Sequence, residues 1–167
     1  VGDAVIITKG AAIEAAALLG SELGDSLRAA GVAAELVERA AGRIKEMTVV
    51  VDARLAMSCS GVHAMHDATE GGLARGLWEV AEASGVGLAI ERARVMLPPD
   101  IEAVCRHFGL NPYEIISEGT LVLTAEQQAV DELLHTYTEA GIPAAVIGTV
   151  VPKDEGPAGG SFLESIF

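Results

Sequence analysis

Residues 62–90 read VHAMHDATEGGLARGLWEVAEASGVGLAI and contain the clearest secondary-structure pattern of the chain. A short apolar run at 62–65 predicts a strand, and polar residues with a Gly-Gly pair follow it. From 70 to 84, apolar residues recur at helical spacing, and Gly85 predicts the end of that helix. The apolar run at 86–90 then predicts a second strand. The stretch therefore predicts a strand, a helix and a strand in succession.

The same patterns extend to both sides of this stretch. Strands are expected at 4–8, 121–123 and 144–151, and helices at 13–19, 32–44, 100–108 and 126–140. The segment 48–51 is apolar but short and fits either a strand or a helix. Because strands and helices interleave, we expect a sheet with helices packed on it. The last strand, helix and strand form either a right-handed crossover or part of a split β-α-β pattern.

Composition limits the classes of partner. The 167 residues fit one domain, and the formal net charge of −13 argues against binding to nucleic acid or to anionic membrane surfaces. Although 50% of the residues are hydrophobic, charged residues such as Glu14, Asp52 and Arg54 interrupt the apolar stretches. None of these stretches approaches the ~20 apolar residues of a membrane-spanning helix.

The cysteines and the first residues bear on location and completeness. Cys59 and Cys105 are isolated among apolar neighbours, which favours two inert thiols in a cytoplasmic protein over a disulfide. A charged segment followed by an apolar one, the mark of a secretory signal, is absent from the start of the sequence. The chain opens VGDAVIITKG, without Met and almost at once in a strand-like run, so we expect a portion of a longer polypeptide.

The polar segment at 63–72 has two interpretations. Asp67 and Glu70 fit a capping pair in which each side chain bonds the backbone N–H of the other residue. Capping does not explain Gly71 and Gly72, because each glycine in a first helical turn costs up to ~1 kcal/mol relative to Ala. Glycine is useful there if something approaches the backbone closely, and a helix N-terminus attracts anions. A helix cap and a phosphate site both remain open.

Two other loops carry weaker signals. Lys9-Gly10 follows the first expected strand, and Glu118-Gly119 precedes the strand at 121–123. Residues at strand ends and helix starts can converge on one edge of a small sheet domain, so the three loops together favour a site. The sequence contains no Ser/His/Asp arrangement, Walker loop or dinucleotide fingerprint.

The two histidines of this region do not predict a metal site. His63 and His66 are three residues apart. On a strand, side chains at that spacing point to opposite faces, so they cannot share one metal ion easily. We therefore predict no metal ligands in this chain.

Three segments together resemble a known family. They are HDATEGGLARGLWEVAEASGVG at 66–87, NPYEIISEGTLVLTA at 111–125 and AAVIGTV at 144–150, and GDAVIITKGAAIE at 2–14 is similar to the opening of the same domain. Together they resemble the C-terminal domain of the AIR synthase (PurM) superfamily. The similarity is strongest to the branch of the hydrogenase maturation factor HypE and the AIR synthase-related proteins, and it extends to about residue 151.

The resemblance implies both fold and site. It implies an α+β fold, with a three-layer α/β/α sandwich on a mixed sheet that is partly ferredoxin-like. It implies that Glu118 is catalytic, assisting proton transfer from a substrate amide or helping to hold Mg²⁺. The residues expected to bind substrate or phosphate are Lys9, Gly10, His66, Asp67, Thr69, Glu70, Gly71, Gly72 and Gly119.

The resemblance also implies a wider setting. Residues 1–151 would be the AIR synthase-related domain, 152–167 a peripheral Gly/Pro-rich tail, and the ATP-binding N-terminal half of the parent protein would be absent. ATP and Mg²⁺ would serve the full-length parent, with no cofactor in this domain alone. Implied partners are that N-terminal half, a second copy in a homodimer and a maturation partner protein.

Two functional hypotheses follow from the resemblance. The first is one half of an ATP-dependent enzyme that activates an amide-type oxygen by phosphorylation, as in HypE-like carbamoyl dehydration. The alternative is a binding or regulatory module that retains the fold without catalysis. An acidic, Gly-rich nucleotide-binding half upstream in the parent would favour the enzyme.

Overall fold

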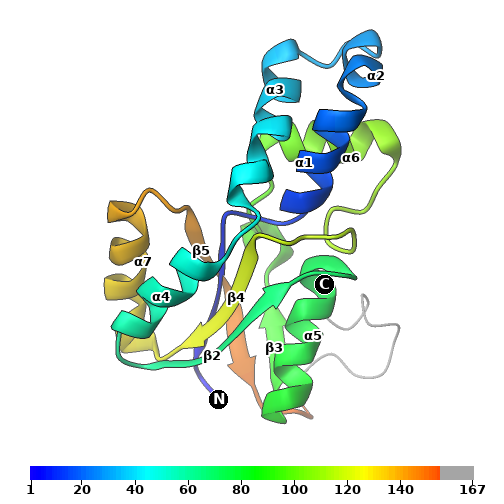
Figure 1. Ribbon diagram of the computed structural model, residues 1–167. Helices are drawn as coiled ribbons and strands as arrows, with labels where there is room; N and C mark the ends of the chain where they lie inside the picture. Colours follow the sequence, from blue (N-terminus) through cyan, green and yellow to red (C-terminus); the bar gives the residue numbers. More distant parts are fainter. Residues whose placement is uncertain (155–167) are drawn as a thin grey trace.

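A computed structural model describes residues 1–154 (Figure 1). The strands are β1 (Ala4–Thr8), β2 (Val62–Ala68), β3 (Gly87–Ile90), β4 (Thr120–Ala125) and β5 (Ala144–Val151). The α-helices are α1 (Ile13–Glu22), α2 (Gly24–Ala29), α3 (Ala34–Gly42), α4 (Val50–Ser58), α5 (Gly72–Ser84), α6 (Pro99–Phe108) and α7 (Val130–Glu139). Short 3₁₀ turns lie at η1 (Arg43–Glu46), η2 (Arg92–Arg94) and η3 (Gln127–Ala129).

The strands form one five-stranded sheet in the order β2-β4-β1-β5-β3. The burial of each strand follows from its place in that order. Every residue of β1 and β4 is buried, as expected for continuous apolar runs inside a sheet. In β2, at one edge, exposed residues alternate with half-buried ones until Ala68. The apolar runs of β1 and β4 thus correspond to inner strands, and the alternation in β2 corresponds to its edge position.

Helices cover both faces of the sheet, which confirms the α+β, three-layer arrangement. Val5 and Ile7 of β1 pack with Leu73 and Leu77 of α5 in one buried cluster. Ile6, between them in the sequence, packs on the other face with residues of α4 and α7. Since alternate residues of a strand point to opposite faces, β1 separates two cores. Figure 1 shows α5 on one side of the sheet and α4 with α7 on the other.

A third cluster lies beyond one end of the sheet, where α1, α2, α3 and α6 gather at the top of Figure 1. An ion pair crosses this part of the molecule: the Arg43 guanidinium of η1 lies 2.5 Å from the Asp100 carboxylate of α6. Both side chains are buried. The helical end is therefore joined by a buried charge pair as well as by apolar packing.

The expected mixed sheet was wrong in its strand directions. All four neighbouring pairs among the described strands are antiparallel. β4 and β5 run in the same direction, but β1 lies between them and pairs with both. The strand–helix–strand unit of β4, α7 and β5 is therefore the split β-α-β alternative.

Several element boundaries differ from the sequence-based expectation. The β2 strand continues to Ala68, so Asp67 lies in the strand and not in a turn. The ambiguous segment 48–51 leads into a helix, α4, and α2 was not expected. Gly85 ends α5 in the left-handed conformation that its position predicted.

The described residues contain no helix long and apolar enough to cross a membrane. Cys59 and Cys105 are both free and buried, and burial raises the pKa of the Cys105 thiol to about 11, which agrees with an inert thiol. The tail predicted at 152–167 lies outside the described residues from 155 onwards.

Candidate functional site

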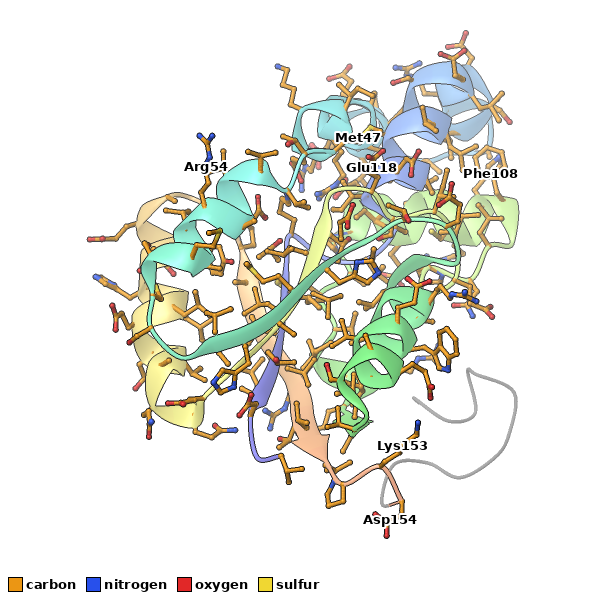
Figure 2. All side chains as sticks on the ribbon, turned by 60° about the horizontal axis from the view of Figure 1, so that its bottom comes forward. Met47, Arg54, Phe108, Glu118, Lys153 and Asp154 are labelled. Carbon is orange, nitrogen blue, oxygen red and sulfur yellow. The ribbon has the colours of Figure 1, made fainter. Side chains whose placement is uncertain are left out.

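Two residues predicted for the site, Asp67 and Glu118, line one cavity of about 450 Å³. Its wall comes from η1, the segment that follows it and the first residue of α4, and the lining residues are Ile44, Lys45, Met47, Thr48, Val49, Val50, Asp67 and Glu118. Figure 2 shows Met47 and Glu118 close together near the helical end of the molecule. The cavity therefore combines two carboxylates and one lysine with an apolar wall.

His66 and Asp67, at the end of β2, have different neighbours. The Nε2 atom of His66 lies 2.7 Å from Glu79 Oε2 of α5, whereas Asp67 lines the cavity. His66 Nδ1 lies 3.4 Å from Asp67 Oδ1. His63 contacts Asp3 instead, at 2.6 Å, so the two histidines serve separate places, as their spacing predicted.

Polar contacts continue from His66 along α5. Arg75 Nε donates to Glu79 Oε1 at 2.9 Å, and the Arg75 guanidinium lies 4.7 Å from the centre of the Trp78 ring. Hydrogen bonds from Arg75 and then from His66 hold the pKa of the Glu79 carboxyl below its ordinary value. Glu79 is therefore an ionised acceptor between two donors.

The loop that carries Glu118 is packed from several sides. The Ser117 hydroxyl accepts a hydrogen bond from Ala12 N at 2.8 Å, and Glu118 N donates to Glu14 Oε2 at 3.3 Å. Gly119 has a φ of 104°, and a Cβ there would lie 2.6 Å from Glu46 O. Gly119 is therefore required where the backbone of this loop passes Glu46.

The Gly-Gly pair does not follow a side-chain cap. The N-cap of α5 is Gly71, and no side chain caps the helix, so the capping pair of Asp67 and Glu70 was wrong. A Cβ on Gly72 would lie 2.5 Å from the carbonyl oxygen of Ile115 and 2.8 Å from the carbonyl oxygen of Tyr113. What approaches the Gly72 backbone closely is thus the protein's own chain.

Gly71 and Thr69 have structural tasks as well. A Cβ on Gly71 would lie 2.7 Å from Arg75 Cβ, so its absence leaves room for the Arg75 stem. Thr69 O accepts hydrogen bonds from Gly72 N at 3.0 Å and from Ser117 N at 3.2 Å. The latter bond places the loop after β2 beside the loop of Glu118.

Lys9 and Gly10 lie deeper than expected. Lys9 Nζ donates to Glu46 O at 3.1 Å, to Thr48 O at 2.8 Å and to Asp52 Oδ2 at 3.1 Å. An ammonium group has three N–H donors, so these acceptors satisfy it. A Cβ on Gly10 would lie 2.8 Å from Met96 O. Both residues are thus explained by contacts within the protein.

The cavity wall was missed from the sequence. Lys45 and Thr48 also line a second cavity of about 500 Å³, so η1 and the segment after it border both cavities. Among residues 1–154 there is no group of three or more His, Cys, Asp or Glu side chains that could hold a metal ion. No motif marks this wall, because its residues are mostly apolar and ambiguous in secondary structure.

Comparison with known families assigns the fold. A family model described as AIR synthase related protein, C-terminal domain, matches residues 1–158. The chain belongs to this family. Among curated members, the carbamoyl dehydratase HypE of Rhizobium leguminosarum bv. viciae is 35% identical over 103 residues, which are 59% of this chain and 29% of that protein. The AIR synthase-related chain thus spans about 29% of the length of this relative.

Solved structures agree with the family assignment. The crystal structure of Escherichia coli HypE superposes with a TM-score of 0.73 and 27% identity, over 90% of this chain and 44% of that one. A HypE crystallised in complex with ATP superposes with a TM-score of 0.63 at 23% identity, over 90% of this chain and 43% of that one, and shows a shared fold. The AIR synthase-related fold expected from the resemblance is confirmed.

Proposed function

We propose that this chain is the C-terminal, substrate-facing part of an ATP-dependent enzyme of the HypE type, which activates an amide-type oxygen by phosphorylation. The observation that carries the proposal is the meeting of Asp67 and Glu118 in one cavity. The family match and the HypE names of its relatives support it. A carbamoyl group is the substrate class that those names suggest.

The cavity suits an amide substrate. Phosphorylation of an amide oxygen makes that oxygen a leaving group, and the amide nitrogen must then give up protons. A carboxylate within hydrogen-bond reach of the nitrogen can accept one of them. Glu118 has this role in the proposal, because its loop is fixed by packing and Glu118 is one of the residues that line the cavity. Lys45 on the same wall supplies a positive charge toward a phosphoryl oxygen.

The residues described here do not fit a triphosphate or a Mg²⁺ ion by themselves. Lys9 is fully engaged with acceptors of the protein. Two carboxylates that share their cavity with an ammonium group lack the oxygen-rich ligand set that Mg²⁺ prefers. In the proposal, the ATP and metal ligands therefore come from the remainder of the parent protein, in agreement with the share of the relatives that this chain spans.

Substitution of Glu118 tests the proposal in the full-length parent. Glu118→Gln removes the charge and keeps the volume, so we expect kcat for substrate-dependent ATP turnover to fall about 100-fold or more with the melting temperature unchanged. Glu35→Gln, an exposed glutamate on α3, is the matched control and should retain the wild-type rate. Wild-type turnover in Glu118→Gln would contradict the catalytic role and favour a binding module that retains only the fold.

A further inference from the structure

A row of polar side chains connects the outer face of α5 to the cavity. Its contacts are Arg75 Nε to Glu79 Oε1 at 2.9 Å, Glu79 Oε2 to His66 Nε2 at 2.7 Å, and His66 Nδ1 to Asp67 Oδ1 at 3.4 Å. Asp67 lines the cavity with Glu118. The row therefore begins at an arginine held over Trp78 and ends at the proposed substrate site.

The order of these contacts fixes the histidine ring. An ionised carboxylate only accepts hydrogen bonds, and Glu79 already accepts one from Arg75. At 2.7 Å, its second oxygen requires that His66 Nε2 carries a proton. Nδ1 is then the ring position that can gain or lose a proton, and it faces Asp67. Glu79 thus determines which nitrogen of His66 faces Asp67.

The proposed reaction removes two protons from the amide nitrogen, one in each of its two steps. A primary carboxamide that becomes a nitrile loses its oxygen and both of its N–H protons. With a nucleoside triphosphate as the phosphoryl donor, one proton leaves when the oxygen is phosphorylated and the other when the phosphate departs. Glu118 can take the first proton, and a second group beside the cavity can take the other from nitrogen before the departing phosphate gains it as hydrogen phosphate.

We propose that Asp67, with His66 behind it, is this second acceptor, and that Glu79 and Arg75 are the positioning residues that orient His66. The inference rests on the function proposed above. The N–H bond breaks as an O–H bond forms on Asp67, and the nitrogen electron pair completes the nitrile while the C–O bond breaks. Phosphate leaves with the C–O electron pair and gains its proton from water. The Asp67 O–H bond then breaks as His66 Nδ1–H forms. The resulting imidazolium lies between the carboxylates of Glu79 and Asp67.

The orientation of His66 can be tested in this chain without substrate. Nitrogen-15 NMR of the ring should show a protonated Nε2 in the wild type and a mixture of tautomers in Glu79→Ala. Glu79→Gln, which keeps an acceptor oxygen, should restore much of the wild-type pattern. Glu82→Ala is the matched control, because Glu82 lies on the same helix and contacts Lys153. Identical ring signals in the wild type and Glu79→Ala would overturn the positioning role.

Kinetics in the full-length parent test the catalytic part separately. We expect Glu79→Ala to lower kcat about tenfold with KM within about twofold, and Asp67→Asn to lower kcat about 100-fold. Glu82→Ala should match the wild type, and all variants should melt within a few degrees of it. Equal kcat in Glu79→Ala and Glu82→Ala would overturn the inference. A parent without ATP-dependent turnover would contradict the proposed function and the second-acceptor role. The NMR result would still show whether Glu79 orients the His66 ring.

Discussion

Gly72 and Gly85 lie at opposite ends of α5 with nearly the same backbone conformation, at φ values of 64° and 65°. Their surroundings differ. A Cβ on Gly72 would meet the carbonyl oxygens of Tyr113 and Ile115 within 2.8 Å, whereas a Cβ on Gly85 would have no neighbour within 4 Å. Substitution at Gly85 therefore measures the free-energy cost of the left-handed backbone alone, whereas substitution at Gly72 adds the cost of steric contact with the two carbonyl groups.

We predict that Gly72→Ala destabilises the protein by about 3 kcal/mol or more. The left-handed conformation costs an L-residue about 1–2 kcal/mol, and overpacking against two carbonyl groups costs about 1–3 kcal/mol more. Gly85→Ala should cost only about 1 kcal/mol. Urea denaturation of both variants measures the difference. Equal free energies of unfolding, or a more stable Gly72→Ala variant as helix propensity alone would give, would contradict this account.

Lys9 marks the limit of sequence reasoning at the residue scale. A lysine after a strand and before a glycine suggested a ligand contact, but its amine is taken by acceptors at Glu46, Thr48 and Asp52. These partners lie 37 to 43 residues away in the sequence. Local pattern carries no information about such partners, since they are set by how α4 packs on the sheet.

At the scale of elements, periodicity identified the helices with a regular apolar face and the buried strands. It missed the last residues of β2, because exposed Asp67 on an edge strand looks like the start of a loop. It also left α4 undecided, because Val49, Val50 and Val51 are β-branched and favour a strand locally. The predicted strand directions were wrong because strand pairing is a long-range property that local sequence patterns do not contain. The resemblance implied a mixed sheet, whereas all the neighbouring pairs among the described strands are antiparallel.

The buried contact between η1 and α6 leads to a prediction about elements. Asp100 is fully buried and accepts two hydrogen bonds from Arg43, so Asp100→Asn leaves the buried guanidinium with only the more exposed Glu46 carboxylate as a counter-charge. We expect a loss of about 3–5 kcal/mol in unfolding free energy. Glu102→Gln breaks an exposed ion pair with Arg106 on the same helix and should cost at most about 0.5 kcal/mol. Thermal and urea unfolding compare the two, and similar losses would refute the role of the buried pair.

For the whole molecule, the sequence predicted the fold through resemblance and named both carboxylates of the cavity. It could not show that Asp67 and Glu118 share that cavity, because the bond from Ser117 N to Thr69 O that joins their loops forms only in the folded chain. The wall around Lys45 was not predicted, since nothing in its composition marks a site.

We predict that this chain alone does not hydrolyse ATP at a significant rate. The 154 described residues contain no cluster of side chains that could hold a metal ion, and Lys9 is engaged by Asp52 instead of being available to bind a triphosphate. A coupled assay for ADP release with Mg²⁺ measures this, and the full-length parent is the positive control. Robust Mg²⁺-dependent turnover by the purified chain that persists after further purification would contradict the proposal that the ATP and metal ligands come from the remainder of the parent protein.

The central position of β1 has a consequence for the order of assembly. β1 contains residues 4–8, yet both of its neighbours, β4 and β5, lie beyond residue 119. During synthesis, the first strand must therefore wait until nearly the whole domain has been made before it gains either partner. Contacts so distant along the chain close slowly, so refolding should take milliseconds to seconds and expose unpaired apolar strands meanwhile. The middle of this sheet is completed after translation of β5, while α1, α2 and α3, which lie between β1 and β2 in the sequence, can form earlier.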